Sequence, residues 1–167
     1  METGFPYEKT IGLMNTLVPR LAALREGSGR RGGFLCVLRR LALGASPLLH
    51  VLIGRVPTDK TTRCFTLSHE KSTRLKRHLS AGHLTSWESR DPSRDRYGGA
   101  IAGTTFLYGF SGFSEDDDSA LMIALALQAD DLSWEDAKRM SARITPMSEN
   151  VIRTVRRLTP DLPIDLL

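Results

Sequence analysis

The chain has 167 residues, of which 41% are hydrophobic and 25% are charged, and this composition is typical of one globular domain that can bury a core. The longest apolar stretches, residues 47–53 and 120–127, are far shorter than the roughly 20 residues that cross a bilayer, so we expect no membrane span. The first residues lack the basic flank and apolar run of a secretory signal, which predicts a cytoplasmic protein. The two isolated cysteines, Cys36 and Cys64, exclude a disulfide framework and predict buried free thiols.

The net charge of +4 hides an asymmetry along the chain. Residues 1–96 contain 17 Lys and Arg against 8 Asp and Glu, and residues 97–167 contain 6 against 11. Such a distribution could attract a nucleic acid, or it could pair the two halves of the chain or of a symmetry mate. Because basic faces are common on ordinary domains, we do not expect a nucleic-acid partner.

The N-terminal third predicts a helix followed by two strands. Apolar residues at spacings of three and four over residues 11–24 predict an amphipathic helix that is kinked or divided at Pro19. The glycine-rich basic run 26–33 lacks the ending and the preceding strand of a phosphate loop, which favours a flexible connection. Residues 34–38 and 47–56 are short, apolar and bounded by Gly or Pro, which predicts strands.

A second helix is predicted to begin near residues 58–60 and to bury one face. Its buried stripe consists of apolar and small residues: Cys64, Phe65, Ser68, Ser72, Leu75 and Leu79. Its basic residues are predicted to form a solvated face: Arg63, Lys71, Arg74, Lys76, Arg77 and His78.

The remaining elements follow in order. Residues 81–96 predict a loop, and residues 97–102 and 104–110 predict a hairpin around Gly103 whose free edge could pair two copies into a homodimer. Residues 120–129 predict a helix that is buried on most faces, and residues 133–144 predict another, begun by Ser133 and Asp136 at the spacing of a capping box. The proline-rich residues 146–167 are interpreted as a C-terminal arm or tail, after a single domain over residues 1–145.

Four consecutive acids, Glu115 to Asp118, precede the apolar helix. Their spacing does not match a calcium loop, and the Gly-Phe-Ser-Gly-Phe run before them, which contains Ser111, is not a nucleophile elbow. Acids in a first helical turn are stabilised by the unpaired backbone N–H groups and by the helix dipole, and Ser114 can act as the cap. This interpretation requires no ligand.

The elements predict an α+β fold in which helices pack on an antiparallel sheet, in the order α-β-β-α-loop-β-β-α-α. With Gly98-Gly99-Ala100-Ile101, Phe110-Ser111-Gly112 and the acids 116–118, this order resembles the GlcG-like haem-binding family, which also occurs beside corrinoid adenosyltransferases. The resemblance covers about residues 8–130 and implies a small-ligand binder that forms oligomers, with haem or cobalamin as candidate cofactors. The family's Lys-Ala-x-x-Ala pattern is at best Lys71-Ser72-Thr73-Arg74 here.

The loop 81–96 carries an indole, a guanidinium, an imidazole and several hydroxyls, which are side chains that bind ligands. We expect a pocket between this loop, Ser111 and the Gly98–Gly99 turn, where Arg90 or Lys71 holds an anionic group and Trp87 forms an apolar wall. The predicted ligand-binding residues are Lys71, His83, Trp87, Ser89, Arg90, Gly98, Gly99 and Ser111. A structural interpretation stands beside this one, with Trp87 in the core and Arg90 paired with Asp91 or Glu88.

These patterns favour a non-catalytic domain that binds a small anionic ligand. No histidine pair or His/Cys cluster has the spacing of a metal site, although His69 or His83 could be a single axial haem ligand. One alternative is a hydrolase or transferase that uses His83 with Ser86 or Ser111. Another is a nucleic-acid or protein interaction module that uses the basic residues 71–77 and 153–157.

Overall fold

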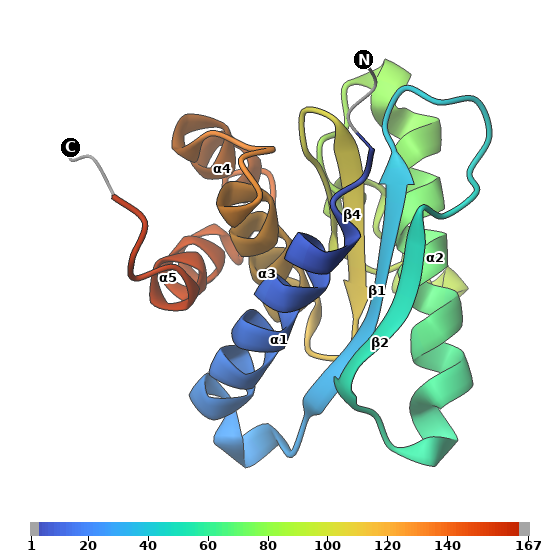
Figure 1. Cartoon of the computed structure of the whole chain (residues 1–167). Helices are drawn as coiled ribbons and strands as arrows, with labels where there is room; N and C mark the ends of the chain where they lie inside the picture. Colours follow the sequence, from blue (N-terminus) through green and yellow to red (C-terminus); the bar gives the residue numbers. More distant parts are fainter. Residues whose placement is uncertain (1–3, 164–167) are drawn as a thin grey trace.

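A computed structural model of the chain describes residues 4–163, which form five α-helices and one four-stranded antiparallel sheet (Figure 1). The strand order is β2-β1-β4-β3. The elements are α1 (Tyr7–Leu24), β1 (Arg31–Arg39), β2 (Leu49–Arg55), α2 (Thr61–His78), β3 (Ala100–Ala102), β4 (Phe106–Ser111), α3 (Glu115–Gln128), α4 (Trp134–Ser141) and α5 (Ser148–Leu158). The predicted α+β class, with helices packed on an antiparallel sheet, is confirmed. No helix in this part of the chain is both long and apolar enough to cross a bilayer.

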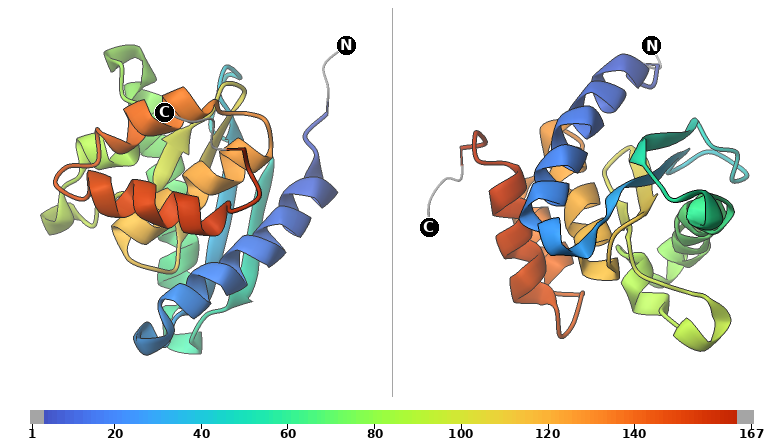
Figure 2. Two further views of the ribbon diagram at one scale, coloured as in Figure 1. Left: turned by 90° about the vertical axis from the view of Figure 1, so that its left-hand side faces the viewer. Right: turned by 90° about the horizontal axis from the view of Figure 1, so that it is seen from below.

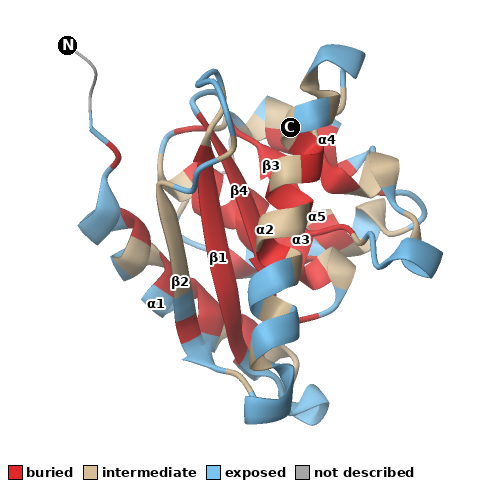
Figure 3. Cartoon of the chain, turned by 90° about the vertical axis from the view of Figure 1, so that its right-hand side faces the viewer, coloured by how far each residue is buried: buried red, intermediate tan, exposed pale blue. Residues whose placement is uncertain are grey.

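The sheet separates two layers of unequal thickness. Helix α2 covers one face, whereas α1 and α3 cover the other, and α5 packs on α3 (Figures 1 and 2). Along β4, Tyr108 and Phe110 enter the large core under α1 and α3, and Leu107 enters a small cluster under α2, as the two-residue period of a strand requires. Strands β1, β3 and β4 are therefore buried on both faces, whereas β2 is partly exposed (Figure 3).

Helix α2 contacts the sheet through small side chains. Ser68 and Ser72 are fully buried, and a Cβ added to Gly109 of β4 would collide with the Ser72 hydroxyl. Ser68, Ser72 and Leu75 confirm part of the predicted buried stripe. Phe65 does not belong to it, because 47% of that residue is exposed.

The first helix is longer than predicted and is not divided. Helix α1 begins at Tyr7 and includes Pro19 in its interior. Leu17, Val18 and Leu21, on both sides of the proline, are buried in the large core. Their burial stabilises the helix across the one backbone N–H that the proline removes.

Strands β3 and β4 form the predicted hairpin around Gly103, but the outer edge of β3 is not free. The backbone N–H of Ala102 donates to the Leu84 carbonyl at 2.9 Å, and that of Ala100 donates to the Ser86 hydroxyl at 3.0 Å. The expectation of a free edge at this hairpin is therefore wrong, because the loop that precedes it covers β3. Among the described strands, β2 is the other edge of the sheet.

The C-terminal helices also contribute to the core. Ser133 caps α4, since its hydroxyl accepts from the Asp136 N–H at 3.0 Å, as predicted. The sequence set residues 146–167 apart as an arm or tail, but Val151, Val155 and Leu158 of α5 are fully buried in the large core. Residues 148–158 therefore pack as part of the domain, and residues 164–167 lie outside the described part of the chain.

Candidate functional site

The four acids at the start of α3 each contact a different part of the molecule. Ser114 is the N-cap residue of α3, but its side chain makes no capping hydrogen bond. Consecutive helical residues point about 100° apart, so four of them reach in four directions. The pairs are Glu115 with Arg90, Asp116 with Asn150, Asp117 with Arg25, and Asp118 with Lys71. The acids therefore connect α3 to the loop 81–96, to α5, to the end of α1 and to α2, and no group of acids, His and Cys that could hold a metal occurs among the described residues.

The pair formed by Lys71 and Asp118 is buried. The Lys71 Nζ lies 3.0 Å from the Asp118 carboxylate, and the two side chains are 3% and 2% exposed. Lys71 also donates to the Phe110 carbonyl at 2.9 Å, and Asp118 accepts from the Phe113 N–H at 2.8 Å. Burial raises the pKa of Asp118, whereas Lys71 and the backbone N–H groups act in the opposite direction.

The expected solvated face of the second helix is wrong at two positions, Lys71 and Arg74. Arg74 is 4% exposed, and its guanidinium donates to Glu70, to the carbonyl oxygens of Ser86 and Tyr97, and to Ser89. The loop 81–96 and the start of α3 cover this side of α2, which supplies acceptors for both cations. Arg74 thereby fixes the loop that carries half of the predicted site residues.

The two glycines of the predicted turn pack closely on the site. Gly99 has φ 116°, which favours glycine, and an added Cβ would lie 2.8 Å from both the Lys71 Nζ and the Asp118 Cβ. An added Cβ on Gly98 would lie 2.5 Å from the Trp87 ring. A residue larger than glycine would therefore displace either the buried ion pair or the indole.

The positions of Trp87 and Arg90 agree in part with the alternative in which both residues have structural roles. The indole packs against the large core and donates to the Thr145 carbonyl at 3.0 Å. Arg90 pairs with Glu115 at 2.8 Å, rather than with Asp91 or Glu88, and its guanidinium lies 5.2 Å from the centre of the Trp87 ring. Glu115 also accepts from the Gly98 N–H, so these residues form one connected group.

A half-open cavity of about 610 Å³ lies beside this group. The beginning of β1, the end of β2, the start of α2 and the Ser111–Glu115 turn surround it. Of the predicted residues, Lys71 and Ser111 line the cavity, and Trp87, Arg90, Gly98 and Gly99 adjoin it through Glu115 and the Lys71–Asp118 pair.

Six basic residues and two acids line this cavity. The acids, Glu115 and Asp118, are both paired within the protein. Within residues 4–163, four of the basic residues form no ion pair: Arg30, Arg31, Arg55 and Lys60. All four are exposed at the rim. The cavity therefore presents unneutralised positive charge.

The cavity wall also has apolar parts and one thiol. Val56, Pro57, Leu67 and Phe113 supply apolar surface. Burial raises the pKa of Cys64, and a hydrogen bond to Ser111 acts in the opposite direction. Cys64 is partly buried, so the predicted buried free thiols are confirmed fully only for Cys36.

The structure separates His83 and Ser89 from this cavity. The His83 ring stacks on the His78 ring with centroids 5.0 Å apart, and Ser89 is held by Arg74. His69 lies near the Ala45 carbonyl. No histidine lines the cavity, so the residues present do not match the axial histidine that the haem expectation requires.

The contacts give little support to the two alternative functions, an enzyme that uses His83 and an interaction module that uses the basic residues. Among the hydrogen bonds of residues 4–163, His83 makes none to Ser86 or Ser111, and the Ser86 hydroxyl accepts from Ala100. In the basic segment 71–77, Lys71 and Arg74 are buried, and Lys76 donates to the Arg39 carbonyl.

Sequence reasoning missed the rim because its cations are scattered between residues 30 and 60. The only sign of these cations in the sequence was the excess of basic over acidic residues within residues 1–96. No family model, no curated protein and no solved structure matches the chain, so the GlcG-like resemblance stays a prediction.

Proposed function

We propose that the protein binds a small organic anion in the cavity between β1, β2, α2 and the start of α3, and that it does so without catalysing a reaction. The observation that carries this proposal is the set of four rim cations without an ion-pair partner among residues 4–163. Cavities of 300–1,000 Å³ hold drug-sized ligands, and this cavity lies within that range.

The interior of the site supports a binding role. Asp118 neutralises Lys71, and together they fix the turn of residues 110–113 through backbone hydrogen bonds. The cavity wall is thereby held in place before any ligand arrives, which lowers the ordering cost of binding. The cations at the rim remain available for a ligand because the internal acids have other partners.

The proposal is tested by mapping amide chemical shifts in ¹⁵N-labelled protein during titration with a panel of small organic anions. We expect concentration-dependent shifts at the cavity glycines Gly29, Gly32 and Gly112. Amides of α4, on the other side of the sheet, serve as the internal control. The proposal fails if no anion shifts the cavity glycines, or if α4 responds equally.

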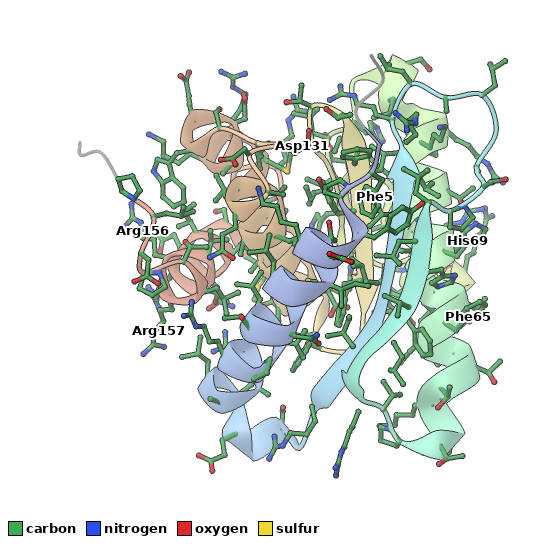
Figure 4. The ribbon with its side chains drawn as sticks, in the orientation of Figure 1. Phe5, Phe65, His69, Asp131, Arg156 and Arg157 are labelled. Atoms are coloured by element: carbon green, nitrogen blue, oxygen red, sulfur yellow. The ribbon has the colours of Figure 1, made fainter. Side chains whose placement is uncertain are left out.

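We also propose a homodimer, formed at β2 because the edge of β3 is covered. Leu52 of β2 is 43% exposed. Phe65 projects from α2 (Figure 4), and its ring stacks on His50 of β2 with centroids 3.9 Å apart. Exposed apolar side chains next to a strand edge favour association. Light scattering should give twice the monomer mass, and Leu52→Glu should give the monomer; a monomer mass for the unsubstituted chain would refute the dimer.

A further inference from the structure

The ligand class can be narrowed from the arrangement of the rim cations, given the proposed function. Arg31 and Arg55 are direct partners in the β1–β2 ladder, and both border this cavity and a second hollow beside Pro19 and Ala22 of α1. Like charges directly opposite each other destabilise a strand pair. Neither arginine forms an ion pair among residues 4–163. The acid that borders the second hollow with them, Glu26, pairs with neither.

Two further cations border the same opening. Arg30 directly precedes Arg31, and Lys60 lies just before α2. A monocarboxylate brings one negative charge, which leaves most of this rim unneutralised. A phosphoryl group brings about −1.5 to −2 charges on three oxygens, and the planar fork of arginine can bind two of those oxygens at once.

The apolar wall of the cavity indicates what the ligand contains besides its charged group. Val56, Pro57 and Leu67 lie beside the rim and offer no hydrogen-bonding side chains. Inorganic phosphate alone would leave this surface in water, whereas an organic body would cover it. We propose that the cavity takes an organic phosphate that carries at least two negative charges and an apolar or aromatic body, of about the size of a nucleoside diphosphate.

The test is isothermal titration calorimetry of the full chain with ADP, pyrophosphate, adenosine and benzoate. We expect ADP to bind about tenfold or more tightly than adenosine or benzoate, because charge-assisted hydrogen bonds are worth more than neutral ones. ADP binding should weaken as salt is raised. Pyrophosphate should bind less tightly than ADP, and equal affinity would overturn the role of the apolar wall.

A matched pair of variants locates the binding. Arg31→Gln with Arg55→Gln should weaken ADP binding about tenfold. Arg156→Gln with Arg157→Gln, which removes the same charge from exposed positions of α5 (Figure 4), should change it by no more than about twofold. Equal losses in both variants would overturn the proposal, as would binding of ADP that salt does not weaken.

The outcomes also separate this inference from the proposed function. If benzoate binds as tightly as ADP and shifts the same cavity glycines, the phosphate inference is wrong and anion binding stands. If no anion binds, both are wrong.

Discussion

Replacing Lys71 by Met should destabilise the fold strongly. The substitution keeps the length of the side chain but removes the charge that lies 3.0 Å from Asp118, and it leaves the Phe110 carbonyl without its donor. Removing one partner of a buried ion pair costs about 3–5 kcal/mol, because the other charge stays buried and uncompensated. Domains of this size have free energies of unfolding of about 5–15 kcal/mol, so the variant should still fold but melt about 10 °C lower.

The loss should depend on pH. Burial already raises the pKa of Asp118, and removal of Lys71 raises it further. The folded variant then holds a proton that the unfolded chain releases near its ordinary pKa of about 4, so the stability of the variant falls as pH rises through the raised pKa. The difference from the unsubstituted protein should be largest at about pH 8 and smaller at about pH 5.5.

Urea unfolding followed by circular dichroism measures both effects. Arg77→Met is the control, because Arg77 is an exposed residue of α2, and its effect should stay within about 0.5 kcal/mol. Adding Asp118→Asn to Lys71→Met should recover part of the loss, since the amide oxygen can still accept from the Phe113 N–H. A loss below about 1 kcal/mol, or the same loss at both pH values, would refute the reasoning.

Three further predictions concern other parts of the structure. Asp131→Asn should cost about 1–3 kcal/mol in urea unfolding, because that carboxylate accepts two backbone N–H groups of the β3–β4 hairpin, whereas the exposed neighbour tested by Asp130→Asn should change little. Burial raises the pKa of Cys36 to about 12, so a thiol reagent should label at most Cys64 in folded protein and both thiols in denaturant; rapid labelling of Cys36 would contradict its burial. Deletion of residues 146–167 removes the three buried apolar side chains of α5, worth about 1.5–3 kcal/mol each, and should abolish the cooperative melt; a sharp melt would contradict the placement of α5 in the core.

Local patterns in the sequence predicted most of the fold. The two-residue and 3.6-residue periods, the glycine of the hairpin and the cap at Ser133 are all properties of neighbouring residues, so the order and type of elements could be inferred. Of the two alternatives predicted at Pro19, a kink or a division, the division was wrong because core packing across the proline outweighed its local effect.

The candidate site was less predictable because it depends on contacts between distant residues. Lys71 and Arg74 follow the pattern of a solvated face, and their burial depends on acceptors 12 to 47 positions away in the sequence. Nothing local distinguishes Glu115, which pairs with Arg90, from an ordinary acid in a first helical turn. The rim cations come together only because β1 and β2 end where α2 begins.

Because four consecutive acids at the start of α3 contact four different elements, an insertion or deletion in this segment should disturb the structure more than a single substitution. A substitution at one of the four positions disconnects one neighbour and leaves the other three in place. An insertion or deletion of one residue between Asp118 and the buried residues that follow it in α3 would turn the whole set by about 100° and uncouple four elements together. Relatives of this chain should therefore conserve the spacing of this stretch, whereas surface connections usually tolerate insertions and deletions.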